Sequence, residues 1–310
     1  GDHPADADTF IRFFDDTGAV VPDFMIDLVE DTAPDATAQV LLEMATLSGN
    51  RFAVMTEQDV ARVYAANGSL LGNLNGPVDD MIQLRDGNIV TAGVVPGHDI
   101  TDSGVHVMLT MRNFNLAAPE NIPGSYDVVT FYVDGNVNRV KDLSNLELAP
   151  LGNGGFALAF VERVNDNSSV IRLSMLSAQG AIEFNGASVS RDFAFDSADG
   201  EFDMIGLSGG GVAMAITRPD AMGPTTGVDI LLFDEDGGLE TRMMVSDGDA
   251  GNQGNPSLVE LPDGRIALSY TDTSAPDSAD RNDTLRIAYF EVDGGGSRFV
   301  GNAGNDLITG

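Results

Sequence analysis

The stretch "PSLVELPDGRIALSY", from Pro256 to Tyr270, consists of two apolar runs joined by Asp-Gly. Each run has the length of a β-strand, and an Asp-Gly pair reaches positive φ without steric penalty, so it closes a tight hairpin. Four further stretches repeat this order of apolar run, glycine turn and apolar run, and we call all five the heads. The other heads are "LLEMATLSGNRFAVMTE" from Leu41, "DDMIQLRDGNIVTAG" from Asp79, "LELAPLGNGGFALAF" from Leu146 and "FDMIGLSGGGVAMAI" from Phe202.

A second kind of segment, which we call the tail, is a strand-length run that ends in an acidic or polar turn with glycine. Tails and heads alternate along the chain, which begins and ends on a tail. The tails are "TFIRFFDDTGAVV" from Thr9, "ARVYAANGSLL" from Ala61, "VVTFYVDGNVN" from Val128, "IRLSMLSAQGAI" from Ile171, "DILLFDEDGGLE" from Asp229 and "LRIAYFEVDGGG" from Leu285. Successive head turns are 38, 67, 56 and 54 residues apart.

This repeat predicts an all-β fold. A four-stranded unit that recurs about every 50 residues is typical of a β-propeller. One such sheet cannot bury both faces alone, so neighbouring sheets share a core. We therefore expect residues 1–300 to form a single β-propeller of four-stranded antiparallel blades. We expect six blades, with five or seven as alternatives, because five heads and six tails do not close a ring evenly.

Three local features bear on that count. The run "GVHVMLTMRNFNLAA" from Gly104 is an insertion that adds a strand to the second unit. The first tail is expected to pair with strands from the far end of the chain and so close the ring. The stretch from Thr56 to Gly72 has good helix formers and a glycine at a C-cap position, but its place in the repeat favours strand. A β-sandwich is the alternative fold, although it does not require the same order five times.

The composition limits the partners. The chain has 16 Lys and Arg against 48 Asp and Glu, a net charge of −32. Such a surface repels nucleic acid and anionic membranes, and it offers oxygen ligands to Ca²⁺. The absence of cysteine excludes disulfides and thiolate metal sites. No apolar run approaches the roughly 18 residues of a membrane span. We expect a monomeric domain that binds no nucleic acid and does not insert into a membrane.

Two stretches resemble known families. The first, from Phe233 to Asp272, carries "FDEDGG", "NPS" and "LPDGR" in the order Phe-Asp-x-x-Gly, Asn-Pro-Ser, Leu-x-Asp-Gly. It resembles the repeat found in tandem in very large secreted bacterial proteins. "LSY", from Leu268 to Tyr270, stands where that repeat has Val-Thr-Trp, and the other four units diverge further.

The second stretch is the closing "GNAGNDLITG", residues 301–310, which resembles the RTX nonapeptide Gly-Gly-x-Gly-x-Asp-x-apolar-x. Asn302 replaces the second glycine. The resemblance implies the start of a parallel β-roll in which Asp306 binds Ca²⁺ between successive turns, so a single turn is expected to bind little. It also implies type I secretion, and therefore a secreted, extracellular protein.

Other acidic loops are calcium candidates, because alternating Asp and Gly lets side-chain and carbonyl oxygens converge on one cation. Asp and Gly are also ordinary turn residues, so a plain polar turn is the alternative at each loop. The candidates are Asp247 and Asp249; Asp234, Glu235 and Asp236; and Asp277, Asp280 and Asp283.

Catalytic signatures are weak. The sequence has no Gly-x-Ser-x-Gly elbow and three histidines. One loop could hold Zn²⁺ through His98, Asp99, Asp102 and His106. Acidic residues in or beside the head strands could supply an axial acid and base, as hydrolytic propellers do. These residues are Asp79, Asp80, Glu147, Asp203 and Glu260. Sugar rings usually stack on Trp or Tyr, and the chain has no Trp and only five Tyr. This composition disfavours a carbohydrate enzyme without excluding it.

We therefore expect a non-catalytic extracellular propeller module of an RTX exoprotein, serving adhesion, ligand binding or display, with a glycan or protein as its partner and calcium as its possible ion. The alternative is a secreted polysaccharide hydrolase or lyase with an axial carboxylate site. A purely structural spacer is a third reading that the sequence does not separate from the first.

Overall fold

The structure is a computed structural model. It describes residues 10–14, 20–27, 41–56, 60–75, 78–96, 105–112, 126–131, 143–165, 168–177, 191–195, 201–219, 225–245, 252–273, 284–292 and 304–307. No helix within these ranges has the length and apolarity needed to cross a membrane.

The described residues form strands joined by short turns. In chain order the strands are β1 (Phe10–Phe14), β2 (Val20–Asp27), β3 (Leu41–Leu47), β4 (Arg51–Thr56), β5 (Val60–Ala65), β6 (Leu70–Asn75), β7 (Asp80–Gln83), β8 (Ile89–Pro96), β9 (Val105–Arg112), β10 (Tyr126–Phe131), β11 (Leu143–Pro150), β12 (Phe156–Asn165), β13 (Ser168–Leu176), β14 (Arg191–Phe195), β15 (Phe202–Gly206), β16 (Val212–Pro219), β17 (Thr226–Phe233), β18 (Leu239–Met244), β19 (Gln253–Glu260), β20 (Ile266–Asp272), β21 (Thr284–Phe290) and β22 (Gly304–Leu307).

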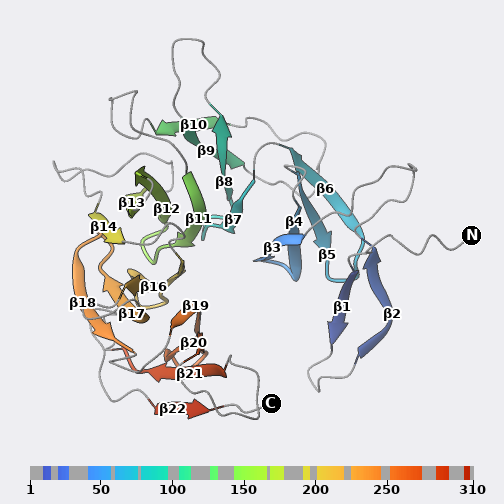
Figure 1. The fold of residues 1–310 in the computed structure, drawn as a ribbon. Coiled ribbons are helices and arrows are strands. Elements are labelled where there is room, and N and C mark those ends of the chain that lie inside the picture. The colour runs from blue at the N-terminus through green and yellow to red at the C-terminus, as the bar shows by residue number, and fades with distance from the viewer. Residues whose placement is uncertain are drawn as a thin grey trace, which may run out of the picture.

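Twenty of these strands form five four-stranded antiparallel sheets, in each of which sequential strands are neighbours. We call the sheets blade 1 (β3–β6), blade 2 (β7–β10), blade 3 (β11–β14), blade 4 (β15–β18) and blade 5 (β19–β22). Figure 1 shows them arranged around a centre, with the first strand of each blade toward the inside. Successive first strands contact one another, from β3 to β7, β11, β15 and β19. The chain is therefore a β-propeller, as the repeat predicts.

The remaining described sheet pairs β1 with β2 only. The expectation that the first tail pairs with the far end of the chain is therefore wrong. The physical reason is that β22 hydrogen-bonds to β21 and already occupies the edge of blade 5. Six blades stay a prediction, because the part of the chain that is described holds five four-stranded sheets and this two-stranded one.

Two other local expectations have clear outcomes. The helix-like stretch after Thr56 forms β5 and β6, which pair with each other while β5 also pairs with β4. The strand in the insertion from Gly104 is β9, the third strand of blade 2, so it completes an ordinary blade instead of adding to one. The four residues of β22 belong to the stretch assigned to the RTX repeat, and they pair antiparallel with β21.

The glycine turns close the heads as the sequence indicates. In blade 2 the Leu84 N–H donates to Asn88 O at 2.8 Å and the Gly87 N–H donates to Leu84 O at 3.0 Å. Gly87 has φ +91°, a conformation that glycine adopts without steric cost. Blades 3, 4 and 5 repeat this pair of hydrogen bonds. The turn therefore fixes where each first strand ends.

Hydrophobic cores fill the seams between blades 1 and 2, blades 3 and 4, and blades 4 and 5. The second strands of blades 3 and 4 supply alanines that are fully buried, Ala157 and Ala159 in β12 and Ala213 and Ala215 in β16. Their small side chains let the next blade approach closely. Large side chains such as Phe233 are also fully buried, and each contributes roughly 1.5–3 kcal/mol of hydrophobic stabilisation.

A buried ion pair recurs in blades 4 and 5 with its charges exchanged. In blade 4, Arg218 Nε lies 2.6 Å from Asp229 Oδ1, and Arg242 Nη2 lies 2.6 Å from Oδ2 of the same carboxylate. In blade 5, the equivalent register positions hold Asp272 and Arg286, whose Oδ2 and Nε lie 3.0 Å apart. The two blades thus keep the pair while the sequence reverses it.

Candidate functional site

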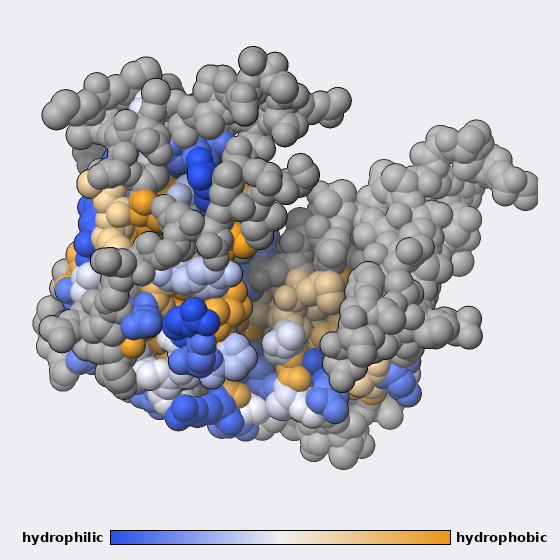
Figure 2. All heavy atoms as spheres, turned by 90° about the horizontal axis from the view of Figure 1, so that it is seen from below, coloured by the Kyte–Doolittle hydropathy of each residue, from blue (hydrophilic) through white to orange (hydrophobic). Residues whose placement is uncertain are grey.

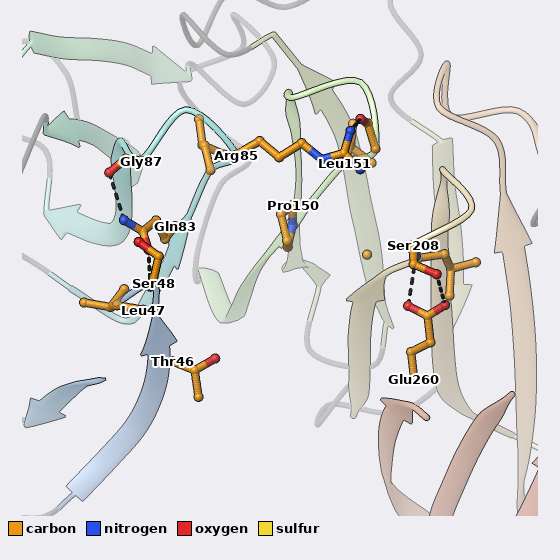
Figure 3. Close-up of a pocket in the computed structure, with 14 residues that line it drawn as sticks. Thr46, Leu47, Ser48, Gln83, Arg85, Gly87, Pro150, Leu151, Ser208 and Glu260 are labelled. Atoms are coloured by element: carbon orange, nitrogen blue, oxygen red, sulfur yellow. Dashed lines mark hydrogen bonds between the residues drawn. The ribbon is translucent and has the colours of Figure 1, made fainter. Parts of the chain in front are cut away.

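A cavity of about 500 Å³ opens where the first strands of all five blades run into their head turns. We call it the axial mouth, and Figure 3 shows the residues that line it. Each of the first four blades contributes the last residues of its first strand, and blade 5 contributes Glu260. Because these ends meet around the centre of the ring, residues more than 200 positions apart in sequence, such as Thr46 and Glu260, share one cavity.

The recurrent leucine of each head holds the mouth in place. Leu47, Leu84, Leu151 and Leu207 are all buried at the start of their turns. Residues on either side of a leucine in extended chain point the opposite way, because side chains alternate along a strand. The flanking positions therefore supply the polar part of the lining. They are Thr46, Ser48, Gln83, Arg85, Gly152, Ser208 and, in blade 5, Glu260.

Side chains at the mouth also join neighbouring blades. The Ser48 N–H donates to Gln83 Oε1 at 2.5 Å across the seam between blades 1 and 2. Arg85 Nη1 donates to Gly152 O at 2.7 Å across the next seam. These bonds hold the polar lining in fixed positions, so the mouth is preorganised.

The seam between blades 4 and 5 carries a paired contact. Ser208 donates twice to the Glu260 carboxylate, from its N–H to Oε2 at 2.8 Å and from its hydroxyl to Oε1 at 2.6 Å (Figure 3). Between blades 3 and 4 the backbones approach directly instead, because a Cβ on Gly206 would lie 1.8 Å from Pro150 O. All four described seams are therefore fixed at the mouth.

Asp80 and Asp203, which the sequence predicts as axial acid–base residues, form hydrogen bonds between neighbouring blades. Asp80 is buried, its Oδ1 accepts from the Met81 N–H at 2.5 Å, and its Oδ2 accepts from the Leu148 N–H of blade 3. This places one carboxylate between the first strands of two blades. The aspartate therefore links blade 2 to blade 3 through backbone hydrogen bonds.

Asp203 makes the same kind of contacts between blades 4 and 5. Its Oδ1 accepts from the Met204 N–H at 2.8 Å and its Oδ2 accepts from the Leu258 N–H of blade 5 at 2.5 Å. Burial raises the pKa of the Asp203 carboxyl above its ordinary value. The hydrogen bonds from Leu258 and Met204 act in the opposite direction without offsetting burial. The carboxyl group is thus partly desolvated and fully engaged.

The other predicted acidic residues have surroundings of their own. Asp79 precedes β7 and is exposed, while Glu147 is half-buried in β11 of blade 3. Glu260 lines the mouth, where Ser208 engages both of its oxygens. The five carboxylates predicted as an acid–base set are therefore distributed over different blades and partners.

The calcium candidates are only partly within the described residues. Asp234 closes the turn between β17 and β18, since its Oδ1 accepts from the Asp236 N–H at 3.0 Å and the Gly238 N–H at 2.5 Å. Asp236 is exposed on the same turn. Asp306 lies in β22 opposite Ile287. Calcium binding at these residues stays a prediction.

The remaining metal candidates fall mostly outside the description. Of the histidine loop, the structure describes only the backbone of His106, in β9. Within the described residues, no group of three or more His, Asp or Glu side chains is placed to hold a metal ion. The residues outside the description are His98, Asp99, Asp102, Asp247, Asp249, Asp277, Asp280 and Asp283.

Sequence reasoning missed most of the mouth. It singled out Glu260 but not its partner Ser208, nor Gln83 and Arg85. These residues carry no motif of their own, and their common property is that they flank the recurrent leucine of a head. A sequence alignment of the five heads on that leucine would have placed these residues at the two positions beside it.

No family model matches the sequence, and no curated protein matches it. Solved structures give distant matches. A thermostable family-43 glycoside hydrolase is 13% identical, with 87% of this chain and 96% of that chain covered and a TM-score of 0.46. A protein described as the Dos1 propeller is 9% identical, with coverage of 94% and 73% and a TM-score of 0.47.

An α-L-arabinofuranosidase from Fusarium graminearum with an iminosugar inhibitor is 10% identical, with 74% of this chain and 65% of that chain covered and a TM-score of 0.48. Several of the similar structures are thus glycoside hydrolases and one is a propeller without a stated activity. Similarity this distant carries no activity over to this chain, and the propeller assignment rests on the five sheets themselves.

Proposed function

We propose that this chain is a non-catalytic extracellular β-propeller module of an RTX-type exoprotein, which binds an external ligand at the axial mouth. The observation that carries the proposal is the preorganised polar lining of a cavity of about 500 Å³ on which all five blades converge. Cavities of a few hundred cubic ångströms with a few fixed polar groups are typical of small-molecule sites. The extracellular and RTX parts rest on the resemblance of residues 301–310.

The lining favours an uncharged, polyhydroxylated ligand. Hydroxyl, amide and backbone carbonyl groups supply both donors and acceptors, and buried leucines lie beneath them. The charged groups at the mouth, Arg85 and Glu260, are each bound across a seam. The net charge of −32 also disfavours anionic ligands. A short segment of a neutral glycan meets these conditions.

The contacts of the carboxylates support a non-catalytic role. Asp80 and Asp203 each accept a backbone hydrogen bond on both oxygens, so the two carboxylates are held by the strands of the seams they join. A glycosidase needs two carboxyl groups facing one bond. The second candidate, a polysaccharide hydrolase or lyase, is favoured by one observation, the raised pKa of Asp203 on an inner strand.

The test is a thermal-shift screen of the purified chain against a panel of soluble neutral glycans, followed by product analysis on each glycan that binds. A ligand that binds the native state alone raises the melting temperature by mass action. We expect a shift without any product. Turnover of the bound glycan would replace the binding module by the hydrolase or lyase.

A matched pair of serine variants locates the site. Ser208→Ala removes a hydroxyl at the mouth, whereas Ser69→Ala removes an exposed turn hydroxyl in blade 1. One neutral hydrogen bond is worth about 0.5–1.5 kcal/mol, so Ser208→Ala should weaken binding roughly 2- to 10-fold. Ser69→Ala should leave the affinity unchanged. Equal effects of the two variants would place the ligand elsewhere.

A further inference from the structure

Blades 1, 3 and 4 each turn an apolar face toward the next blade in the ring. In blade 4 this face holds Ile205 on the first strand, Ala213 on the second and Leu232 on the third, which are neighbours in the register. All three belong to the core between blades 4 and 5. In blade 3 the same positions hold Ala149, Ala157 and Met175, which pack on blade 4.

Among the described sheets, none covers the same face of blade 5. The equivalent register positions are Val259, Ala267 and Tyr289. Val259 is 52% exposed, whereas Ala149 in blade 3 is 1% exposed. The substantial contacts between blade 5 and other described sheets are all with blade 4. Figure 2, which views the molecule from below, shows a hollow with apolar residues at the surface beside it.

The uncovered face is hollowed. A cavity of about 630 Å³ lies over it, lined by side chains of β19, β20 and β21. Arg265 lies at its edge with its guanidinium carbon 5.6 Å from the centre of the Tyr289 ring. In each of the other seams with a described core, side chains of the next sheet pack against this face. A hollowed, partly apolar sheet face is a surface on which another segment can dock.

The occupant is indicated by the order of the ring. After blade 5 the next sheet around the ring is β1–β2, which Figure 1 places on the arc between blade 1 and the end of the chain. On the other side of that arc, blade 1 has Phe52 and Tyr64 buried and stacked, with ring centres 5.4 Å apart. The sequence of β1, Phe-Ile-Arg-Phe-Phe, is apolar enough to cover a sheet face.

We propose that the uncovered face of blade 5 is the closing seam of the propeller and that the chain's own hairpin β1–β2 docks on it. The hairpin contains the first tail, which precedes the first head in the alternation of tails and heads. Because it is tethered to the ring, docking within one chain is favoured over docking between chains. Docking also fixes Glu260 relative to Thr46, which line the axial mouth on the two sides of the opening.

Because the native chain has no cysteine, a single introduced cysteine is the only thiol that can be labelled. Val259→Cys places a single thiol on the seam, and Met244→Cys places one on β18 as the matched control. The two native side chains have nearly equal exposure, 52% and 54%. If the seam is closed for more than nine-tenths of the time, a maleimide should label Val259→Cys at least about tenfold more slowly than Met244→Cys. Equal labelling rates would overturn the proposal.

The identity of the occupant is tested in the same assay. Adding Phe13→Asp puts a charge into the hairpin, and burying an unpaired charge is costly, so labelling of Val259→Cys should rise to the control rate. If that variant unfolds, the double variant Phe13→Cys with Val259→Cys replaces it and should be joined within one chain by a short bismaleimide. Protection that disappears on dilution, with cross-links only between chains, would assign the seam to a second copy and overturn docking of the hairpin.

Discussion

Replacing Asp203 by asparagine removes a carboxylate that links blade 4 to blade 5 through backbone hydrogen bonds. The asparagine oxygen can accept from only one of the two N–H groups that Asp203 now engages, those of Met204 at 2.8 Å and Leu258 at 2.5 Å. The other N–H is left without an acceptor in a partly buried seam, which costs about 1–3 kcal/mol. Removing a desolvated charge offsets part of this loss, so we expect a net destabilisation of about 1–2 kcal/mol.

The pH dependence of that difference follows from the pKa. Burial raises the folded-state pKa of Asp203 above 3.8, its value in the unfolded chain. The protonated carboxyl group therefore contributes stability that is fully present below 3.8 and is lost as the pH rises through the folded-state pKa. The stability lost in Asp203→Asn should accordingly be largest at acidic pH and decline toward neutral pH.

The assay is urea denaturation of both proteins at a series of pH values. Asp263→Asn is the matched control, because Asp263 is an exposed head-turn carboxylate whose pKa is lowered by its hydrogen bond from Arg265. Its contribution has the opposite sign, being present above the unfolded-state pKa and lost as the pH falls. A difference for Asp203→Asn that grows as the pH rises would show that the hydrogen bonds outweigh burial, and would refute this reasoning.

Two further predictions concern the seams and the buried charges. Gly206→Ala should destabilise the chain by more than about 2 kcal/mol, because its Cβ would lie 1.8 Å from Pro150 O. In the control Gly154→Ala the new Cβ meets no atom within 4 Å, so this variant should cost only about 1 kcal/mol for its positive φ. Equal melting temperatures of the two variants would contradict the close approach of the backbones. Asp229→Asn should cost about 3–5 kcal/mol in urea denaturation, because it leaves Arg218 without a buried counter-charge, and a loss below about 1 kcal/mol would count against a buried pair.

The blades could be read from the sequence because their signals are local. An apolar run, a glycine turn and a second apolar run predict a hairpin within 15 residues, and the head from Pro256 to Tyr270 forms one between β19 and β20. The strand β5 is a case in which position in the repeat gave a better prediction than helix propensity. Its pairing with β4 and β6 outweighs its helix-forming residues.

The mouth could not be read in this way, because its contacts join residues far apart in the chain. Ser208 and Glu260 are 52 positions apart, and Asp80 and Leu148 are 68 apart. The sequence does show that Asp80 and Asp203 stand on inner strands, but it does not show whether their carboxylates act as acid and base or accept backbone hydrogen bonds. Only the positions of the neighbouring N–H groups distinguish these two roles.

The end of the ring was the hardest part to predict. The count of heads and tails suggested that the first tail would complete the last blade, yet that edge is occupied by β22. The competing signal was the RTX-like stretch, whose residues 304–307 read as the start of a calcium repeat and form a strand on β21. A short, glycine-containing strand carries too few apolar residues to be recognised by alternation.

The central claim is that the five head turns form one preorganised binding site that does not carry out chemistry. The most direct measurement is an NMR titration of the isotope-labelled chain with a neutral glycan from the thermal-shift screen, in which both the amide shifts and the glycan signals are followed. The account predicts shifts concentrated at residues 46–48, 83–87, 150–152, 206–208 and 260, with the glycan signals unchanged over time. Shifts confined to other parts of the ring, or the appearance of shortened glycan, would contradict it.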